Sequence, residues 1–197
     1  MTDCILVDID GTLADTRHRL HYLQKKPKDW KSFFDAMVDD PPHQYIVDLV
    51  NMLAETHPIF LVSGRPESHL IQTKNWLQKN QVICYENIYM RKEKDYRPDT
   101  IIKKEFLEDI RKIRMSPKFA IDDRPDVVRM WRENGVPCLQ VDDRAWYEPF
   151  KGDDPLDWLN WMQTQHQEPM FKKAAEELEY LRRSLQNAII LSTEWLR

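Results

Sequence analysis

Residues 4–15 read CILVDIDGTLAD, a short apolar run that ends in two aspartates one position apart, followed by Gly-Thr. A continuous apolar run is typical of a strand covered on both faces, as in a parallel sheet with helices on either side. Asp8 then falls at the carboxyl end of that strand, where open α/β sheets bind their ligands. Asp8 and Asp10 begin on the same side of the extended backbone, and Gly11 permits a sharp turn after them.

The paired carboxylates of Asp8 and Asp10 indicate a cation site. Like charges at short range repel, and each raises the pKa of the other unless a cation separates them. Hard oxygen ligands of this kind favour Mg²⁺. The alternative is an acidic turn without a ligand, because Asp-Gly is a common turn dipeptide.

The rest of the chain alternates between strand-like and helix-like segments. This alternation predicts an α/β fold with a mainly parallel sheet flanked by helices, within a core domain of residues 1–152. A small helical insertion is expected at about 15–43, after the first strand, and a C-terminal helical extension at 153–197. The apolar stripe of that extension would dock on its own domain or form a homo-oligomer. We expect further strands at 59–62, 82–89, 118–121 and 136–141, and helices at 15–23, 28–38, 44–56, 68–79, 99–113 and 125–134.

Composition limits the class of protein. The chain has 197 residues, of which 42% are hydrophobic and 31% charged, as in an ordinary soluble globular protein. Its net charge of −4 argues against a broad basic surface that coats nucleic acid, but leaves room for a local basic pocket. The three cysteines lack metal-ligand spacing and are expected to be buried thiols. Without a signal peptide or a long apolar run, the sequence predicts a cytoplasmic protein with no membrane partner.

Two further clusters follow predicted strands. Ser63, Gly64 and Arg65 offer a hydroxyl, free backbone N–H groups and a guanidinium, which together would bind an anion. The alternative is an ordinary turn with a surface arginine. Asp122 and Asp123 are adjacent carboxylates directly after an apolar strand, a costly choice unless a cation or basic group lies nearby. The alternative for them is a surface acidic pair.

Lys103 is a further candidate, on the helix predicted at 99–113. Asp99 precedes it by one helical turn, so an i,i+4 ion pair would position its ammonium group. The alternative is a solvent-exposed lysine, and the adjacent Lys104 competes for any such role.

Taken in chain order, these motifs resemble the haloacid dehalogenase (HAD) superfamily. The order is D-x-D-G-T, a strand followed by S-G-R, a helical lysine, and a strand followed by D-D. Within the superfamily, the stretches LVSGR, DTIIK and AIDDRPDVVRMWRENGVPCLQV are most similar to the 3′-phosphatase domain of phage polynucleotide kinase/phosphatase. The resemblance covers roughly residues 3–143, with the insertion matched poorly. The kinase motif G-x-x-x-x-G-K-[ST] is absent, so a stand-alone phosphatase with a Rossmann-like HAD core is expected.

The resemblance implies an Mg²⁺-dependent phosphatase mechanism. Asp8 would attack phosphorus and form an aspartyl-phosphate, while Asp10 would protonate the leaving oxygen and then activate water. The Mg²⁺ cofactor would be held by Asp8, the Asp10 backbone carbonyl, Asp122 and Asp123. Ser63, the Gly64 N–H and Lys103 would hold the phosphoryl oxygens. The remaining implied site residues are Arg19, Arg65 and Arg91 as phosphate or substrate contacts, and Asp99 as the residue that orients Lys103.

The substrate implied by the resemblance is a 3′-phosphorylated nucleic-acid end, as in nucleic-acid repair. The partly basic insertion would guide a strand or close over a small nucleotide. One alternative is therefore a 5′- or 3′-nucleotidase that acts on free mononucleotides. A second is a catalytically inactive HAD-fold module that serves in assembly.

Overall fold

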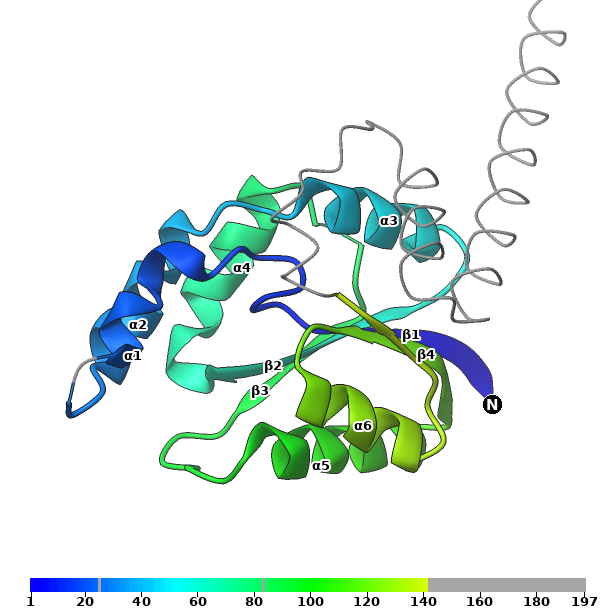
Figure 1. Cartoon of the computed structure of the whole chain (residues 1–197). Coiled ribbons are helices and arrows are strands. Elements are labelled where there is room, and N and C mark those ends of the chain that lie inside the picture. The colour runs from blue at the N-terminus through cyan, green and yellow to red at the C-terminus, as the bar shows by residue number, and fades with distance from the viewer. Residues whose placement is uncertain (25, 83, 142–197) are drawn as a thin grey trace, which may run out of the picture. The chain divides into compact units, whose positions relative to one another are not determined.

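The computed structural model describes residues 1–24, 26–82 and 84–141, and within them a five-stranded parallel sheet in the order β3-β2-β1-β4-β5 (Figure 1). This confirms the predicted α/β class. The strands are β1 (Thr2–Val7), β2 (Ile59–Pro66), β3 (Asn87–Arg91), β4 (Met115–Asp122) and β5 (Cys138–Gln140). The predicted C-terminal extension, its oligomer contact and the domain boundary at 152 lie outside the described residues.

Helices cover both faces of the sheet. Figure 1 shows α3 and α4 on one face and α5 and α6 on the other. Their bounds are α3 (Gln44–Ala54), α4 (Leu70–Lys79), α5 (Asp99–Lys112) and α6 (Pro125–Glu133). None of the helices in the described ranges is long and apolar enough to span a lipid bilayer.

The central strand explains the apolar run in the sequence. β1 pairs with β2 on one side and β4 on the other, so that Ile5 lies opposite both Ile59 and Phe119. All four residues from Cys4 to Val7 are 0% exposed. A strand with neighbours on both edges and helices on both faces has no side that favours polar residues, which accounts for the unbroken run.

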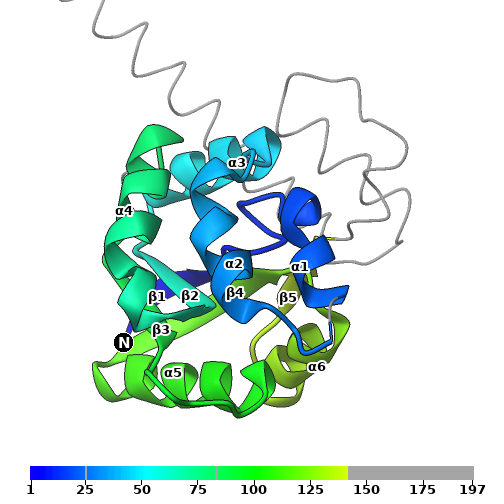
Figure 2. The same ribbon diagram turned by 90° about the vertical axis from the view of Figure 1, so that its left-hand side faces the viewer.

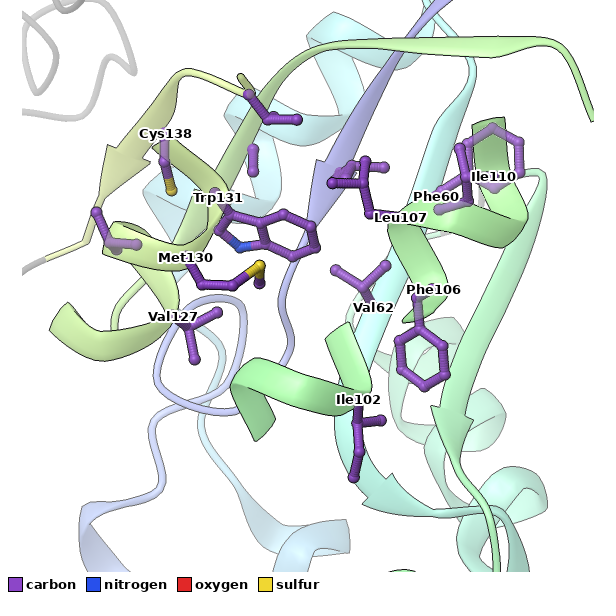
Figure 3. Packing of buried hydrophobic residues seen from close by; sticks show 14 of the residues in the cluster. Phe60, Val62, Ile102, Phe106, Leu107, Ile110, Val127, Met130, Trp131 and Cys138 are labelled. Atoms are coloured by element: carbon purple, nitrogen blue, oxygen red, sulfur yellow. The ribbon is translucent and has the colours of Figure 1, made fainter. Parts of the chain in front are cut away.

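A core beneath α5 and α6 holds this half of the fold together. Trp131 of α6 lies among apolar side chains from the sheet and from α5 (Figure 3). Phe106 contacts Tyr89 of β3, with their ring centroids 5.5 Å apart. Because α5 packs on the sheet through these side chains, its polar residues near the carboxyl edge have fixed positions. The cluster includes Cys4, Leu6, Phe60, Val62, Ile102, Phe106, Leu107, Ile110, Val127, Val128, Trp131 and Cys138.

The insertion after β1 consists of short helices rather than the two longer ones expected. They are η1 (Arg17–Arg19), α1 (His21–Gln24), α2 (Trp30–Asp35) and η2 (Ala36–Asp39). The Asp29 side chain caps the start of α2 by accepting a hydrogen bond from the Ser32 N–H at 3.1 Å. Figure 2 shows α1 and α2 in front of the sheet, on the side where the strands end.

The third strand begins later than predicted, which also corrects one cysteine. The sequence indicated a strand at 82–89, whereas β3 begins at Asn87, which pairs with Phe60 near the start of β2. Residues before Asn87 precede the partner strand and have little of it to pair with. Cys84 lies in this region and is exposed, whereas Cys4 and Cys138 are buried as expected.

Candidate active site

The ends of three adjacent strands place polar side chains at one edge of the sheet. Asp8 follows β1, Ser63 lies in β2, and Asp122 ends β4. The Asp8 N–H donates to the Ile121 carbonyl at 3.0 Å, which extends the pairing of the two strands. Because these strands are parallel, their carboxyl ends meet at the same edge, as the sequence analysis expected.

Lys103 connects two of these strand ends. Its Nζ lies 2.8 Å from Asp8 Oδ1 and 2.7 Å from Asp122 Oδ2, and the residue is 2% exposed. Burial by itself would lower the pKa of Lys103, but the charges of Asp122 and Asp8 outweigh it and raise the pKa. The ammonium group therefore stays charged between two carboxylates. Lys104, by contrast, is exposed.

Asp99 is not the partner of Lys103 that the sequence predicted. Its carboxylate instead forms ion pairs with Arg91 and Arg124, while Lys103 turns to the two strand-end carboxylates. Asp99 also packs against Gly64, where an added Cβ would lie 2.8 Å from Asp99 Oδ1. Arg91 Nε donates to the Gly64 carbonyl at 3.0 Å. Asp99 and Arg91 thus support the Ser-Gly-Arg turn.

Three carboxylates form a cluster suited to a cation. Asp8, Asp122 and Asp123 each offer an oxygen, and these oxygens lie within 4.8 Å of one another. Burial raises the pKa of Asp8 to about 7. The positive charge of Lys103 lowers this pKa, and the negative charge of Asp122 raises it further, so that the net shift is upward. Burial and the charges of Asp8 and Asp122 also raise the pKa of Asp123 well above its usual value. Carboxylates that destabilise each other's charged forms in this way are what a divalent cation would neutralise.

The individual oxygens differ in how far they are satisfied. Asp122 Oδ2 accepts hydrogen bonds from Lys103 and from Trp131 Nε1, the latter at 3.1 Å. Among the described residues, Asp123 Oδ1 is buried with no hydrogen-bond partner. A buried, unsatisfied carboxylate oxygen beside two other carboxylates fits a metal ligand.

Gly11 is required by the same cluster. Its φ is +85°, and a Cβ at this position would lie 2.2 Å from Asp123 Oδ2. Any other residue would combine backbone strain with a steric overlap. The glycine in D-x-D-G-T therefore allows the first loop to lie directly against the Asp123 carboxylate.

Asp10 is held by two buried arginines. Its Oδ1 accepts hydrogen bonds from Arg19 Nη2 at 2.7 Å and from Arg65 Nε at 2.8 Å. Both arginines are 0% exposed, whereas the Asp10 side chain is 24% exposed. Burial would raise the pKa of Asp10, but the charges of Arg65 and Arg19 outweigh it and lower the pKa. The contact of these arginines with a phosphate stays a prediction.

Sequence reasoning missed Asp40, which completes this network. The Asp40 carboxylate accepts hydrogen bonds from Arg19 Nε and Nη2, both at 2.7 Å, and from Arg65 Nη2 at 3.1 Å. His18 Nε2 lies 2.8 Å from its Oδ1, and Trp76 Nε1 donates to its backbone carbonyl at 2.8 Å. Asp40 is 4% exposed. It lies in the D-D-P-P stretch that the sequence analysis interpreted as a polar turn, and nothing local distinguishes it from Asp39.

A family model identifies the fold and the coarse activity. The model described as the polynucleotide kinase PNKP phosphatase domain matches residues 2–146. The chain belongs to this family. It is therefore a phosphatase of the HAD superfamily, as the resemblance in the sequence implied.

Relatives of this phosphatase include larger proteins. A proposed bifunctional polynucleotide kinase/RNA ligase from Autographa californica nuclear polyhedrosis virus is 28% identical over 137 residues, which are 68% of this chain and 18% of the viral protein. A chain of the Pnkp1/Rnl/Hen1 RNA repair complex is 32% identical with a TM-score of 0.62, and the match covers 72% of this chain and 43% of that one. This chain thus spans less than half of either relative. A haloacid dehalogenase-like hydrolase from Streptococcus pneumoniae is similar in fold, with a TM-score of 0.55, 16% identity, and coverage of 83% of this chain and 99% of that one.

We predict that Asp40→Asn weakens both stability and turnover. The change leaves two buried guanidinium groups with one carboxylate, Asp10, so the free energy of unfolding should fall by about 3 kcal/mol. Displacement of Asp10 should lower kcat by roughly 100-fold. Denaturant unfolding and steady-state kinetics would measure these two effects. Asp39→Asn, an exposed neighbour, serves as the control, and equal behaviour of the two variants would contradict the prediction.

Proposed function

We propose that this chain is an Mg²⁺-dependent phosphomonoesterase that removes 3′-phosphates from nucleic-acid ends through an aspartyl-phosphate intermediate. The observation that carries the proposal is the pairing of the buried Lys103 with Asp8, within the acidic cluster of Asp8, Asp122 and Asp123. This arrangement supports a mechanism in which Asp8 would be the nucleophile, Asp10 the proton donor and Lys103 a fixed positive charge, as phosphoryl transfer through an enzyme carboxylate requires.

Asp8 is the proposed nucleophile. Its carboxylate would bond to phosphorus while the bond from phosphorus to the leaving oxygen breaks, which gives the aspartyl-phosphate. Lys103, 2.8 Å from Asp8 Oδ1, supplies positive charge where a negatively charged phosphate must approach a carboxylate. Ser63 and the Gly64 N–H are proposed to hold the phosphoryl oxygens from the adjacent strand.

Asp10 is the proposed acid and base. Within the described residues both arginines donate to its Oδ1, which leaves Oδ2 as the oxygen for proton transfer. The entry of a negatively charged phosphate beside Asp10 would raise its affinity for a proton, against the effect of the arginines. Asp10 would donate that proton to the leaving oxygen, and then accept one from the water that hydrolyses the intermediate.

The metal site is proposed at the acidic cluster. Asp8, the Asp10 backbone carbonyl, Asp122 and Asp123 would hold Mg²⁺, which would supply positive charge between nucleophile and phosphate. The unsatisfied Asp123 Oδ1 favours Asp123 as a direct ligand, because both oxygens of Asp122 already accept hydrogen bonds.

The choice of substrate rests on the relatives. The names of the viral protein and of the repair complex refer to polynucleotide and RNA processing, which supports a nucleic-acid end as substrate. The net charge of −4 fits a free mononucleotide equally well. The exposed Lys26 and Lys28 of the insertion are the cations proposed to contact phosphates further along a strand.

Asp8→Asn should abolish turnover and leave the fold intact, because the amide has the same shape but is a poor nucleophile. Asp10→Asn should lower kcat/KM for an alkyl phosphate by about 10²- to 10⁴-fold. It should lower kcat/KM for p-nitrophenyl phosphate much less, since that leaving group needs no proton. Phosphate release and circular dichroism provide the readouts, and near-normal turnover by Asp8→Asn would exclude the mechanism.

Chelation should remove activity reversibly. We expect EDTA to abolish phosphate release and Mg²⁺ or Mn²⁺ to restore it, because the proposed ligands are all oxygen atoms. Ca²⁺ should bind but support little turnover, since its larger and looser coordination misplaces the nucleophile. Asp123→Asn should weaken the response to Mg²⁺ in titrations of activity. Full activity after exhaustive chelation would rule out the metal site.

A substrate panel tests the biological assignment. A 3′-phosphorylated oligonucleotide should have a higher kcat/KM than the matching 3′-mononucleotide, and the advantage should shrink as salt rises. The double variant Lys26→Glu, Lys28→Glu should reduce the advantage and leave p-nitrophenyl phosphate hydrolysis unchanged. Faster hydrolysis of 5′-mononucleotides than of any oligonucleotide, with no salt dependence, would favour the nucleotidase.

A further inference from the structure

The insertion carries a cluster of aromatic side chains, Trp30, Phe33 and Phe34, all from α2. The Trp30 ring stacks on Phe34 at an interplanar angle of 21° and meets Phe33 edge-on at 88°, with ring centroids 5.9 Å apart in both pairs. Phe33 is 7% exposed, whereas Trp30 is 49% exposed. The Trp30 ring thus packs on two other aromatic rings and is also open to solvent.

This aromatic cluster is continuous with the candidate active site. The Arg19 guanidinium carbon lies 4.1 Å from the centre of the Phe33 ring, and the same guanidinium donates to Asp10 at 2.7 Å. Three successive contacts therefore join the Asp10 carboxylate to Trp30. Figure 2 shows α2 in front of the carboxyl ends of the strands, where Asp8 and Asp122 lie.

Contacts near both ends of α2 hold the helix that carries Trp30, and two lysines precede Trp30 in the chain. Asp29 caps α2 directly before it, and Phe34 contacts the His69 ring of η3 (Glu67–His69) at 5.6 Å, which ties the helix to the core. The Lys28 Nζ lies over the Trp30 ring, 5.6 Å from its centroid, and both Lys28 and Lys26 are exposed. A base that stacks on this face of the ring would displace the Lys28 ammonium group toward the neighbouring phosphate. Lys31, next to Trp30 in α2, pairs with Asp35 and so offsets the negative charge of that carboxylate.

We propose that Trp30 stacks on a base of the nucleic-acid strand whose 3′-phosphate is bound at Asp8, while Lys26 and Lys28 contact the phosphates beside that base. The proposal rests on the proposed function and adds a binding site for the strand. An exposed indole that follows two exposed lysines in the chain matches the chemistry of single-strand binding, in which bases stack on aromatic rings and lysines contact the backbone. Such a site would tolerate any base, because every base has a flat face.

The experiment combines a protein change with a substrate change. We compare wild type, Trp30→Ala and Trp30→Phe on 3′-phosphorylated oligonucleotides with normal bases or with abasic residues at the last two positions. Trp30→Ala should lower kcat/KM for the normal strand by about 5- to 100-fold. Trp30→Phe should recover part of this loss. In wild type, the abasic strand should show a similar loss, and Trp30→Ala should no longer distinguish the two strands.

Controls separate stacking from folding and from the chemistry. Trp30→Ala should hydrolyse p-nitrophenyl phosphate as wild type does. Ile113, at the end of α5, is another apolar side chain and is 56% exposed. Ile113→Ala should leave kcat/KM unchanged for both the oligonucleotide and p-nitrophenyl phosphate. Binding of the normal strand to Asp8→Asn, measured by fluorescence anisotropy, should weaken when Trp30→Ala is added.

Several outcomes would overturn the stacking site. One is an equal loss of kcat/KM on normal and abasic strands. Another is a loss that extends to p-nitrophenyl phosphate together with a fall in melting temperature, which would assign Trp30 to packing within the chain. If wild type hydrolyses no phosphate monoester, the proposed function itself fails. If wild type hydrolyses normal and abasic strands equally well, only the stacking site fails.

Discussion

The buried ammonium of Lys103, between Asp8 and Asp122, is the interaction on which the site depends. Two carboxylates at neighbouring strand ends would repel each other strongly in a desolvated setting. The ammonium lies within hydrogen-bonding distance of both and is itself delivered by α5, which the apolar core packs onto the sheet. The packing of one helix thus places a positive charge between the proposed nucleophile and the end of β4.

A second network, of Asp10, Arg19, Arg65 and Asp40, contains equal numbers of acidic and basic side chains. It combines Asp10 of the loop after β1, Arg19 and Asp40 of the insertion, and Arg65 of β2. Asp10 is the member that reaches solvent; Arg19 and Arg65 restrict its orientation, and Asp40 in turn holds both arginines. The two networks act on different aspartates. Lys103 stabilises the negative charge of Asp8, whereas Arg19 and Arg65 orient Asp10.

Much of the fold and part of the site could be predicted because their signals are local. The apolar run at residues 4–7 predicts a buried strand of a parallel sheet. The aspartates that follow β1 and end β4 predict acidic side chains at the carboxyl ends of the strands. Asp40 gave no such signal, because its role comes from arginines brought to it by distant parts of the chain. The predicted pair of Asp99 and Lys103 was wrong for a related reason. The i,i+4 spacing permits it, but each side chain finds stronger partners on other elements.

The double hydrogen bond from Arg19 to Asp40 closes the insertion at its two ends. The segment between them is held at both ends, and its Phe33 packs on Arg19. Changes elsewhere in the exposed part of this segment therefore need not move Asp10. Loops held in this way tolerate insertions at small entropic cost. Within this family, we therefore expect Arg19 and Asp40 to be replaced rarely and the segment between them to vary more in sequence and length. Changes in the insertion would then leave the arginines that hold Asp10 in place.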